Sequence, residues 1–218
     1  MKHERFPGFT VGVTGGIGSG KSAVCAILEN LGRPVVHADP LARGLMESDA
    51  RVRAEITSLL GPDAYIAGGK LNRSLVANLI FNDRQLLRRV NAIVHPAVTK
   101  EIRDRLLQMS EDQRRPYSVI EAALIYESGL DSLLHAVVAI DAPFELRVAR
   151  VTSRDNTDGK DVLKRAQAQF SPEKIMKRAD FVIGNQGSLE ELKERVTFVH
   201  SLLISMSHER CTESVNSS

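Results

Sequence analysis

The 218-residue sequence predicts an α/β protein whose mostly parallel β-sheet is flanked by helices. Short apolar runs alternate with amphipathic helical stretches toward both ends of the chain, which is the pattern of such a sheet. From about residue 40 to 112 no convincing strand occurs, and apolar residues recur at helical spacing. The sequence therefore predicts one domain over residues 8–206, with its core in 8–39 and 115–206 and a helical insert between them.

Five apolar runs are the candidate strands. Two of them, at residues 137–140 and 181–183, are rich in β-branched side chains, as central parallel strands tend to be. The predicted strands lie near residues 9–14, 34–37, 117–121, 135–140 and 180–184. The predicted helices cover residues 21–31, 143–153, 160–169 and 188–206.

A glycine-rich loop between the first strand and the first helix is the most informative stretch. The run Gly15-Gly16-Ile17-Gly18-Ser19-Gly20-Lys21-Ser22 matches the phosphate-binding pattern G-x-x-x-x-G-K-[ST] at every fixed position. Its glycines let successive backbone N–H groups face a triphosphate, while Lys21 would reach the β- and γ-phosphates and the Ser22 hydroxyl would ligate Mg²⁺. Ala23 continues the set into a helix N-terminus, which favours anions. The loop predicts binding of a nucleoside triphosphate and defines the sheet as one of the P-loop type.

Three other segments have expected roles. The insert looks like an acceptor-binding subdomain, in which Pro96 should kink or interrupt a long helix or start a new one. Residues 155–160 are polar and turn-prone with helices on either side, which suits a lid at about 154–170 over the nucleotide. Residues 207–218 are polar, and we expect them to fray as a flexible tail.

The bulk composition argues against several classes of partner. The net charge is +2 and the pI about 8.6, so neither nucleic acid nor an acidic membrane is expected as the main partner. Cys25 and Cys211 lie far apart and form neither a metal-ligand spacing nor a disulfide framework, which favours a reducing cytosol. No signal-peptide pattern occurs, and no apolar run approaches the roughly 18 residues that span a bilayer. We therefore expect a soluble, cytoplasmic protein.

Three acidic residues are candidates for the site. Asp39 follows the second strand, so its carboxylate could accept a proton from an acceptor hydroxyl, or it could cap a helix that has Pro40 at its first position. Glu121 ends the third strand, where an acid can orient Mg²⁺ or its water. Glu127 could cap a backbone group, contact the acceptor, or be a solvated loop acid.

Basic residues near the expected lid are a second group of candidates. Arg147, Arg150 and Arg154 recur at i, i+3 and i+7 and therefore share a helix face. Beside a triphosphate such a face could neutralise charge on the transferring phosphoryl group, and this interpretation is favoured for Arg150 and Arg154 and left open for Arg147. His95 precedes Pro96 in the insert, and a lone histidine is more often structural than catalytic.

Taken in order, these motifs resemble those of the dephospho-coenzyme A kinase family from about Thr10 to Leu192. No single later motif is specific, but their order and spacing together are. The matching segments, beyond the loop, are His37-Ala38-Asp39-Pro40-Leu41-Ala42-Arg43, Gly69-Lys70-Leu71-Asn72-Arg73, Ile80-Phe81, Ile93-Val94-His95-Pro96, Glu121-Ala122-Ala123-Leu124-Ile125-Tyr126-Glu127, Arg150, Arg154-Asp155, Arg165, Gln169 and Ala179-Asp180-Phe181-Val182-Ile183 with Asn185.

The resemblance implies phosphorylation of the ribose 3′-hydroxyl of dephospho-CoA by ATP and Mg²⁺, the last step of coenzyme A synthesis. It also implies that Asp39 is the base or orienting acid and that Arg43, Arg73 and His95 belong to the acceptor side. Three positions depart from the family pattern: His37 replaces an acid, Asn72 replaces Asp, and Ala123 replaces Pro. None of these three departures changes Lys21 or Asp39, so we expect the chain to keep the kinase activity that the resemblance implies.

Three other interpretations of the sequence compete with a dephospho-coenzyme A kinase. Another small-molecule P-loop kinase would share the ATP site and differ only in its acceptor. A GTPase switch would need Asn-Lys-x-Asp and Asp-x-x-Gly, which the sequence lacks. A degenerate relative that binds CoA-like ligands without catalysis is the third reading, prompted by His37. A monomer or weak homo-oligomer is expected.

Overall fold

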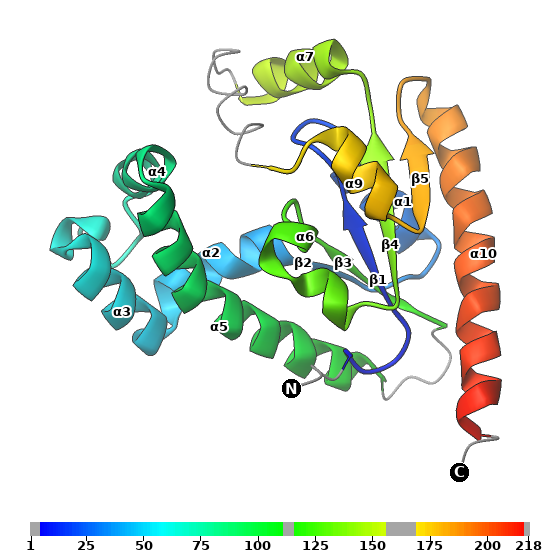
Figure 1. Ribbon diagram of the computed structural model, residues 1–218, viewed down its shortest axis with the longest axis horizontal. Helices are drawn as coiled ribbons and strands as arrows, with labels where there is room; N and C mark the ends of the chain where they lie inside the picture. The colour runs from blue at the N-terminus through cyan, green and yellow to red at the C-terminus, as the bar shows by residue number, and fades with distance from the viewer. Residues whose placement is uncertain (1–4, 111–115, 156–168, 216–218) are drawn as a thin grey trace. The chain divides into compact units, whose positions relative to one another are not determined.

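The structure is a computed structural model, and it describes residues 5–110, 116–155 and 169–215. At its centre is a five-stranded sheet in the order β2-β3-β1-β4-β5, in which the β1–β3, β1–β4 and β4–β5 pairings are parallel (Figure 1). The strands are β1 (Thr10–Thr14), β2 (Val35–His37), β3 (Ser118–Glu121), β4 (Ala136–Asp141) and β5 (Phe181–Gly184). The five predicted strands and the parallel sheet are therefore confirmed.

Burial explains why these runs form the sheet. All five residues of β1 are buried, and β4 is buried over its first five. A parallel strand covered on both faces needs a continuous apolar run rather than alternation, and β-branched side chains pack well in it. Thr10 is buried in this row because its N–H and hydroxyl both contact His135 Nδ1, at 3.1 and 3.0 Å.

Helices cover the sheet and carry the rest of the core. They are α1 (Lys21–Asn30), α6 (Ile125–Ser128), α7 (Phe144–Asp155), α9 (Pro172–Arg178) and α10 (Leu189–Val215), with the 3₁₀ turn η2 (Leu130–Leu133) after α6. In Figure 1, α10 runs along the β5 side of the sheet. Val24, Cys25 and Leu28 of α1 pack with Val196 and Leu203 of α10 in one buried cluster.

The prediction of a frayed tail from Ser207 is wrong for its first part, because α10 continues to Val215. Ser207 is only 2% exposed, and its hydroxyl donates to the Ile204 carbonyl at 2.7 Å. A hydroxyl bonded to the preceding turn is compatible with a helix, so polar composition did not end it. Most of the predicted helix at 160–169 and most of the predicted lid lie outside the described residues.

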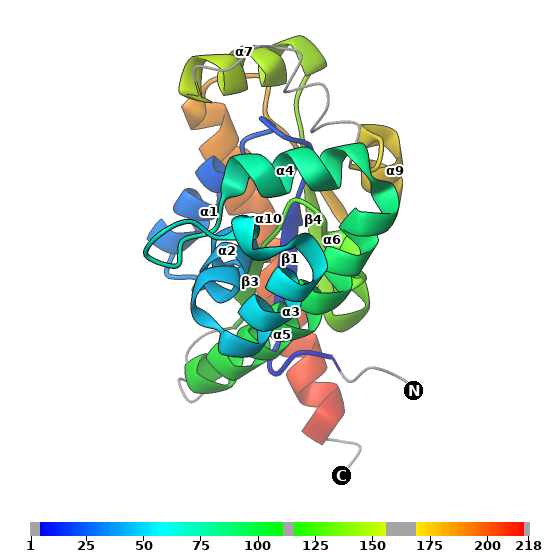
Figure 2. The same ribbon diagram turned by 90° about the vertical axis from the view of Figure 1, so that its left-hand side faces the viewer.

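Residues His37–Asp104 form a second compact unit, and the remainder of the chain forms the first. The second unit contains α2 (Ala38–Ser48), α3 (Ala50–Leu60), the 3₁₀ turn η1 (Pro62–Ala64), α4 (Arg73–Asn82) and most of α5 (Arg84–Ser110), as Figures 1 and 2 show. Its only extended pairing among described residues is an isolated bridge between Tyr65 and Leu71. The expectation of a helical segment between two sheet strands is met.

Pro96 neither ends α5 nor begins a new helix, contrary to two of the three outcomes expected for it. Pro lacks an N–H, so the carbonyl four residues earlier loses its helical partner. That carbonyl belongs to Ala92, and both residues are exposed, so water can bond to it. A long helix can therefore continue through this position.

No described helix has the length and apolar character needed to cross a membrane.

Candidate active site

The phosphate-binding loop connects the buried strand β1 to α1, and its backbone has the conformation that the glycines were expected to allow. Gly15, Gly18 and Gly20 have φ values of 149°, 77° and 100°. Gly20 is the N-cap of α1 in the left-handed region, and as a glycine it has no side chain to cap this helix start. A helix N-terminus without a side-chain cap is suited to an anion, because its first N–H groups and its dipole both favour negative charge.

The two predicted metal ligands are next to each other in this structure. Glu121 ends β3, which pairs with β1 so that Glu121 is opposite Val13. The Ser22 hydroxyl, in the first turn of α1, donates to Glu121 Oε1 at 3.3 Å. Neighbouring parallel strands end at the same edge of the sheet, which is why residues 99 positions apart meet here. No group of three or more His, Cys, Asp or Glu side chains that could hold a metal occurs within the described ranges.

Lys21 lies against the loop that it was predicted to serve. Its Nζ donates to the Gly15 carbonyl at 3.0 Å and to the Gly16 carbonyl at 3.5 Å. The ammonium group is therefore already held at the phosphate-binding loop. A bound phosphate would compete with these neutral carbonyl acceptors through stronger, charge-assisted hydrogen bonds.

Arg150 and Asn185 fix the loop from the other side. Asn185 Nδ2 donates to the Ser19 carbonyl at 2.7 Å, and Arg150 donates to the same carbonyl at 3.5 Å and to the Asn185 carbonyl at 3.1 Å. Asn185 directly follows β5, and its own N–H donates to the Asp141 carbonyl at 2.7 Å. The Arg150 side chain therefore contacts the predicted site through a backbone carbonyl of the phosphate-binding loop. The candidate set omitted Asn185, whose signal was a polar residue directly after a predicted strand.

The three arginines of α7 do not have equal surroundings. Arg147 is 8% exposed, its guanidinium lies against Gly16, and its Nε has no partner among the described residues. A side chain at position 16 would collide with that guanidinium. Arg150 is half-buried, and Arg154 is exposed in the last turn of the helix. The shared helix face therefore runs from a buried contact with the loop to solvent.

Hydrogen bonds of Gln169 and Glu127 connect residues 169–170 to the phosphate-binding loop and to the segment after β3. The Ile17 N–H donates to Gln169 Oε1 at 2.9 Å, and Gln169 Nε2 donates to the Ala123 carbonyl at 3.4 Å. Glu127 Oε1 accepts a hydrogen bond from the Phe170 N–H at 2.5 Å. Of the three roles considered for Glu127, capping a backbone N–H is the one that the structure displays. Gln169, like Asn185, was named in the family resemblance but was given no site role, because a single glutamine gives no pattern of its own.

The remaining candidates, Asp39, Arg43, Arg73 and His95, belong to the second unit. Because α2 begins at Ala38 with His37 as its N-cap, the prediction that Asp39 caps the helix is wrong by two positions. Asp39 is exposed in the first turn, and its backbone carbonyl accepts from Arg43 Nε at 3.4 Å. The helix starts early because β2 leads into it without an intervening turn.

Arg73 and His95 have different environments within that unit. Arg73 forms an ion pair with Glu47 at 3.7 Å, and its side chain is 63% exposed. His95 is half-buried on α5, and this burial lowers its pKa. Burial thus favours the neutral imidazole, which can accept as well as donate a hydrogen bond.

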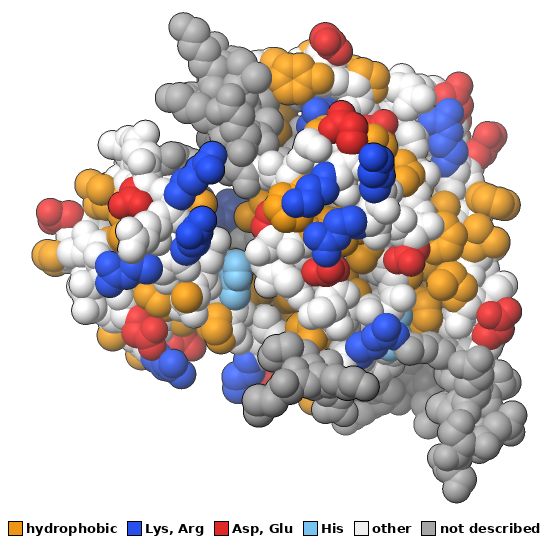
Figure 3. Space-filling view, viewed as in Figure 1, with side chains coloured by type: hydrophobic (Ala, Val, Ile, Leu, Met, Phe, Trp, Pro, Cys, Tyr) orange, Lys and Arg blue, Asp and Glu red, His pale blue; other side chains and the backbone are white. Residues whose placement is uncertain are grey.

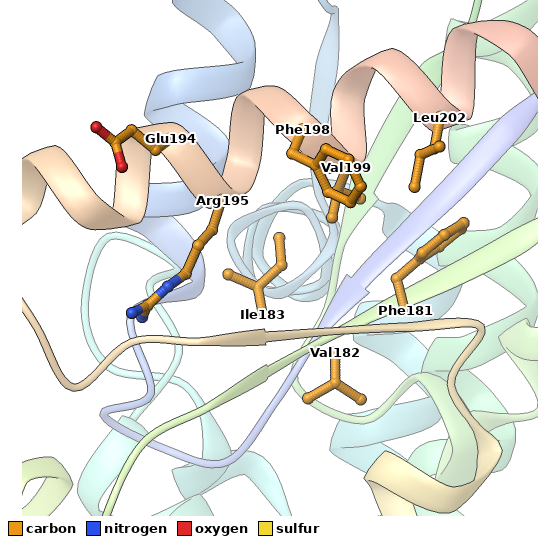
Figure 4. A pocket seen from close by; sticks show the side chains of 8 residues that line it. All are labelled: Phe181, Val182, Ile183, Glu194, Arg195, Phe198, Val199 and Leu202. Atoms are coloured by element: carbon orange, nitrogen blue, oxygen red, sulfur yellow. The ribbon is translucent and has the colours of Figure 1, made fainter.

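The first unit also has a groove that contains none of the candidate site residues. It has a volume of about 420 Å³ and is lined by β5 and α10, with apolar side chains along most of its length (Figure 4). Figure 3 shows apolar side chains gathered on this side of the molecule, and Phe198 is 65% exposed there. The groove contains no residue of the phosphate-binding loop, so its size does not make it the nucleotide site.

A parallel sheet, a phosphate-binding loop after its central strand, and an acid at the end of the adjoining strand together define a P-loop nucleotide-binding protein. Comparison with known families narrows this class. A model of the dephospho-CoA kinase family matches residues 9–191, and the chain therefore belongs to that family.

Individual relatives agree. The dephospho-CoA kinase of Salinibacter ruber is 40% identical over 186 residues, which cover 85% of this chain and 93% of the relative. A solved Thermus thermophilus protein has a TM-score of 0.74 and 36% identity, with 90% of this chain and 98% of the other covered. A shikimate kinase from Acinetobacter baumannii, solved with shikimate, has a TM-score of 0.51 at 15% identity, covering 91% of this chain and 94% of its own, and shares the fold alone.

Proposed function

We propose that this protein is a kinase that transfers the γ-phosphoryl group of ATP to the ribose 3′-hydroxyl of dephospho-CoA, giving coenzyme A and ADP. This reaction is the last step of coenzyme A biosynthesis. The observation that carries the proposal is the family match over residues 9–191, which spans the phosphate-binding loop, the Glu121 strand end and Asn185. The fold alone would leave the acceptor open, because kinases of other acceptors have it too.

Mg²⁺ fits the donors present at the loop. The ion prefers oxygen ligands and is usually held by one or two protein oxygens together with substrate phosphates and water. The Ser22 hydroxyl and the Glu121 carboxylate are such donors, 3.3 Å apart. When bound, the ion would neutralise charge on the β- and γ-phosphates.

The electrostatic contribution to catalysis would come from the loop and from α7. Phosphoryl transfer passes through a loose transition state whose charge spreads over the equatorial oxygens, so positioning and positive charge are the main requirements. Backbone N–H groups of the phosphate-binding loop and of the first turn of α1 would hold the phosphates, while the Ile17 N–H stays bonded to Gln169. Lys21 would move from the Gly15 carbonyl to phosphate oxygens. Arg154, exposed at the end of α7, would add a further cation, while Arg150 would keep the loop in shape.

The second unit would supply the acceptor side. Asp39 would orient the 3′-hydroxyl and take its proton late in the reaction, and such general-base help is worth about 10²–10⁴-fold. Arg43 and Arg73 would bind anionic groups of the acceptor, and neutral His95 would contribute a hydrogen bond. We further propose a cytoplasmic location, a monomeric or weakly oligomeric state, and no nucleic-acid or membrane partner.

The test is ADP release from ATP and Mg²⁺ with and without dephospho-CoA, followed by mass spectrometry of the acceptor. We expect ADP release that depends on dephospho-CoA, and one added phosphoryl group on that acceptor. ATP binding without turnover would contradict the proposal and lead to a panel of nucleosides and other small alcohols. Tight GTP-specific binding without any acceptor turnover would instead support a nucleotide switch.

A further inference from the structure

Gln169 forms a bridge between two backbone groups that belong to different parts of the site. Its Oε1 accepts from the Ile17 N–H in the phosphate-binding loop at 2.9 Å, and its Nε2 donates to the Ala123 carbonyl at 3.4 Å. Ala123 is two residues beyond Glu121, the proposed metal-side acid. A carboxamide is suited to this bridge because it presents one acceptor and two donors on a single planar group.

The segment that carries Gln169 is itself anchored. The N–H of the next residue, Phe170, donates to Glu127 Oε1 at 2.5 Å. The Lys174 ammonium lies 3.5 Å from the centroid of the Phe170 ring, a cation–π contact. Both the main chain and the following side chain are therefore held, so the Gln169 carboxamide has a defined position.

A second group of contacts holds α6, the helical turn that contains Glu127. The Arg178 guanidinium lies 4.3 Å from the centroid of the Tyr126 ring and forms an ion pair with Asp131 at 2.8 Å. Tyr126 adjoins Glu127, so these contacts tie α9 to the helical turn that supplies the carboxylate. The order of the contacts is thus α9, Glu127, Gln169 and the phosphate-binding loop.

The position of Ile17 in the loop explains how the Gln169 bridge can affect phosphate binding. Ile17 lies between Gly16 and Gly18, and Gly18 has a φ of 77°, so the loop contains residues with few conformational restrictions. A loop that is not held in shape must lose conformational freedom when it binds phosphate, and this lowers its affinity. A hydrogen bond at Ile17 removes part of that freedom in advance.

We propose that Gln169 is a positioning residue for the phosphate-binding loop, and that Glu127 sets the place of Gln169 by holding the Phe170 N–H. This inference rests on the proposed function for its link to catalysis, but its first consequence is ATP affinity, which needs no acceptor. Gln169 aligns the loop with the turn that follows Glu121, so that Ser22 and Glu121 keep their spacing.

The first measurement is ATP binding by calorimetry, without acceptor, for the full-length chain and its Gln169→Leu variant. We expect the Kd for ATP to rise about tenfold, as loss of one hydrogen bond and a less ordered loop would produce. In turnover assays the KM for ATP should rise while the KM for dephospho-CoA stays within twofold. The matched control is Gln108→Leu, at an exposed position of α5.

Glu127 provides an independent arm. Glu127→Ala should weaken ATP binding in the same direction, because the Phe170 N–H loses its acceptor, and Glu127→Gln should rescue it, because an amide oxygen can still accept. Combining Glu127→Ala with Gln169→Leu should add little to the Gln169→Leu effect, since both residues act through one chain of contacts.

The outcomes separate this inference from the proposed function. A folded Gln169→Leu chain with ATP affinity within twofold of the parent overturns the inference whether or not dephospho-CoA is phosphorylated. Equal changes in both KM values, together with a lower Tm, also overturn it, because they indicate general loss of structure. If Gln169→Leu does not fold, Gln169→Glu tests the same point: it keeps an acceptor for Ile17 and loses the donor to Ala123.

Discussion

The two units of the chain present their candidate residues in opposite ways. Around the phosphate-binding loop, Lys21, Arg150 and Asn185 are buried or half-buried and donate to backbone carbonyls, as Asn185 does to the Ser19 carbonyl. In the second unit, Asp39 and Arg43 are exposed on a helix surface. If the proposed roles hold, the first region would bind its ligand with a shaped backbone, and the second with side chains that solvent reaches.

This contrast has an energetic consequence. A buried polar group that loses its partner costs about 1–3 kcal/mol of stability, whereas substitutions of exposed residues usually change it by about 0.5 kcal/mol or less. Substitutions at the loop should therefore affect stability and nucleotide affinity together. Substitutions of the exposed Asp39 and Arg43 should affect turnover or acceptor binding while the fold persists.

The largest expected effect is on turnover by Asp39→Asn. We expect kcat to fall by about 10²–10⁴-fold, because the amide cannot take the acceptor proton. The Kd for ATP and the Tm should change little, since the side chain is exposed. Steady-state kinetics and calorimetry check this, with Asp49→Asn as a control that keeps an oxygen able to accept from the Val52 N–H. Unchanged kcat would mean that Asp39 takes no part in activating the acceptor.

Gly20→Ala should have the largest effect on stability. A Cβ at this position would collide with Asn185 Nδ2, and the φ of 100° is strained for any residue with a side chain. We expect a loss of at least about 1–2 kcal/mol, the cost of left-handed backbone alone, and weaker ATP binding. Thermal unfolding and calorimetry measure both.

The control for this variant is Gly44→Ala, within α2, where a Cβ would meet nothing within 4 Å. That change should stabilise the protein by about 0.5–1 kcal/mol, since alanine loses less backbone freedom in a helix. Equal effects of the two substitutions would remove the distinction between a shaped loop and a tolerant helix surface.

The smallest expected effect concerns pH. Burial lowers the pKa of His95 below its ordinary 6.5, so the unfolded chain binds a proton more readily than the folded one. The free energy of unfolding should therefore fall as the pH drops below about 6.5. His200 contributes with the same sign, because burial and Arg33 lower its pKa.

Denaturant unfolding between pH 7 and pH 5 measures this dependence. His95→Gln should make it shallower, and His208→Gln, at an exposed position of α10, is the control. An unchanged slope in the His95 variant would indicate that His95 is fully hydrated, and the contrast between a neutral, half-buried His95 and the exposed Asp39 and Arg43 would then be lost.

Much of the fold could be predicted because its signals are local. The buried apolar runs gave all five strands, and the spacing of G-x-x-x-x-G-K-[ST] located the loop. The extension of α10 beyond Met206 could not be predicted, and the outcome at Pro96 in α5 was left open among three, because both depend on hydroxyl bonding and exposure rather than on apolar spacing. The start of α2 at Ala38 could not be predicted either, because no turn residue separates this helix from β2.

The site was predictable only where motif and topology coincide. Ser22 and Glu121, each predicted to serve the metal, lie next to each other because they come from the ends of adjacent strands; their role toward the metal stays a prediction. The contacts of Asn185 with Ser19 and of Gln169 with Ile17 join residues 166 and 152 positions apart, and a single amide residue carries no periodicity that would indicate them.

Cys25 lies in the buried cluster behind the phosphate-binding loop, one helical turn after Lys21. Burial, reinforced by Glu121, raises the pKa of its thiol, and only the thiolate reacts readily with electrophiles. In a chain with Cys211→Ser, alkylation at this position would proceed only when α1 separates transiently from the sheet and α10. The alkylation rate would thus be a chemical measure of how often that layer opens, and the degree to which ATP slows it would report how strongly nucleotide binding stabilises the layer.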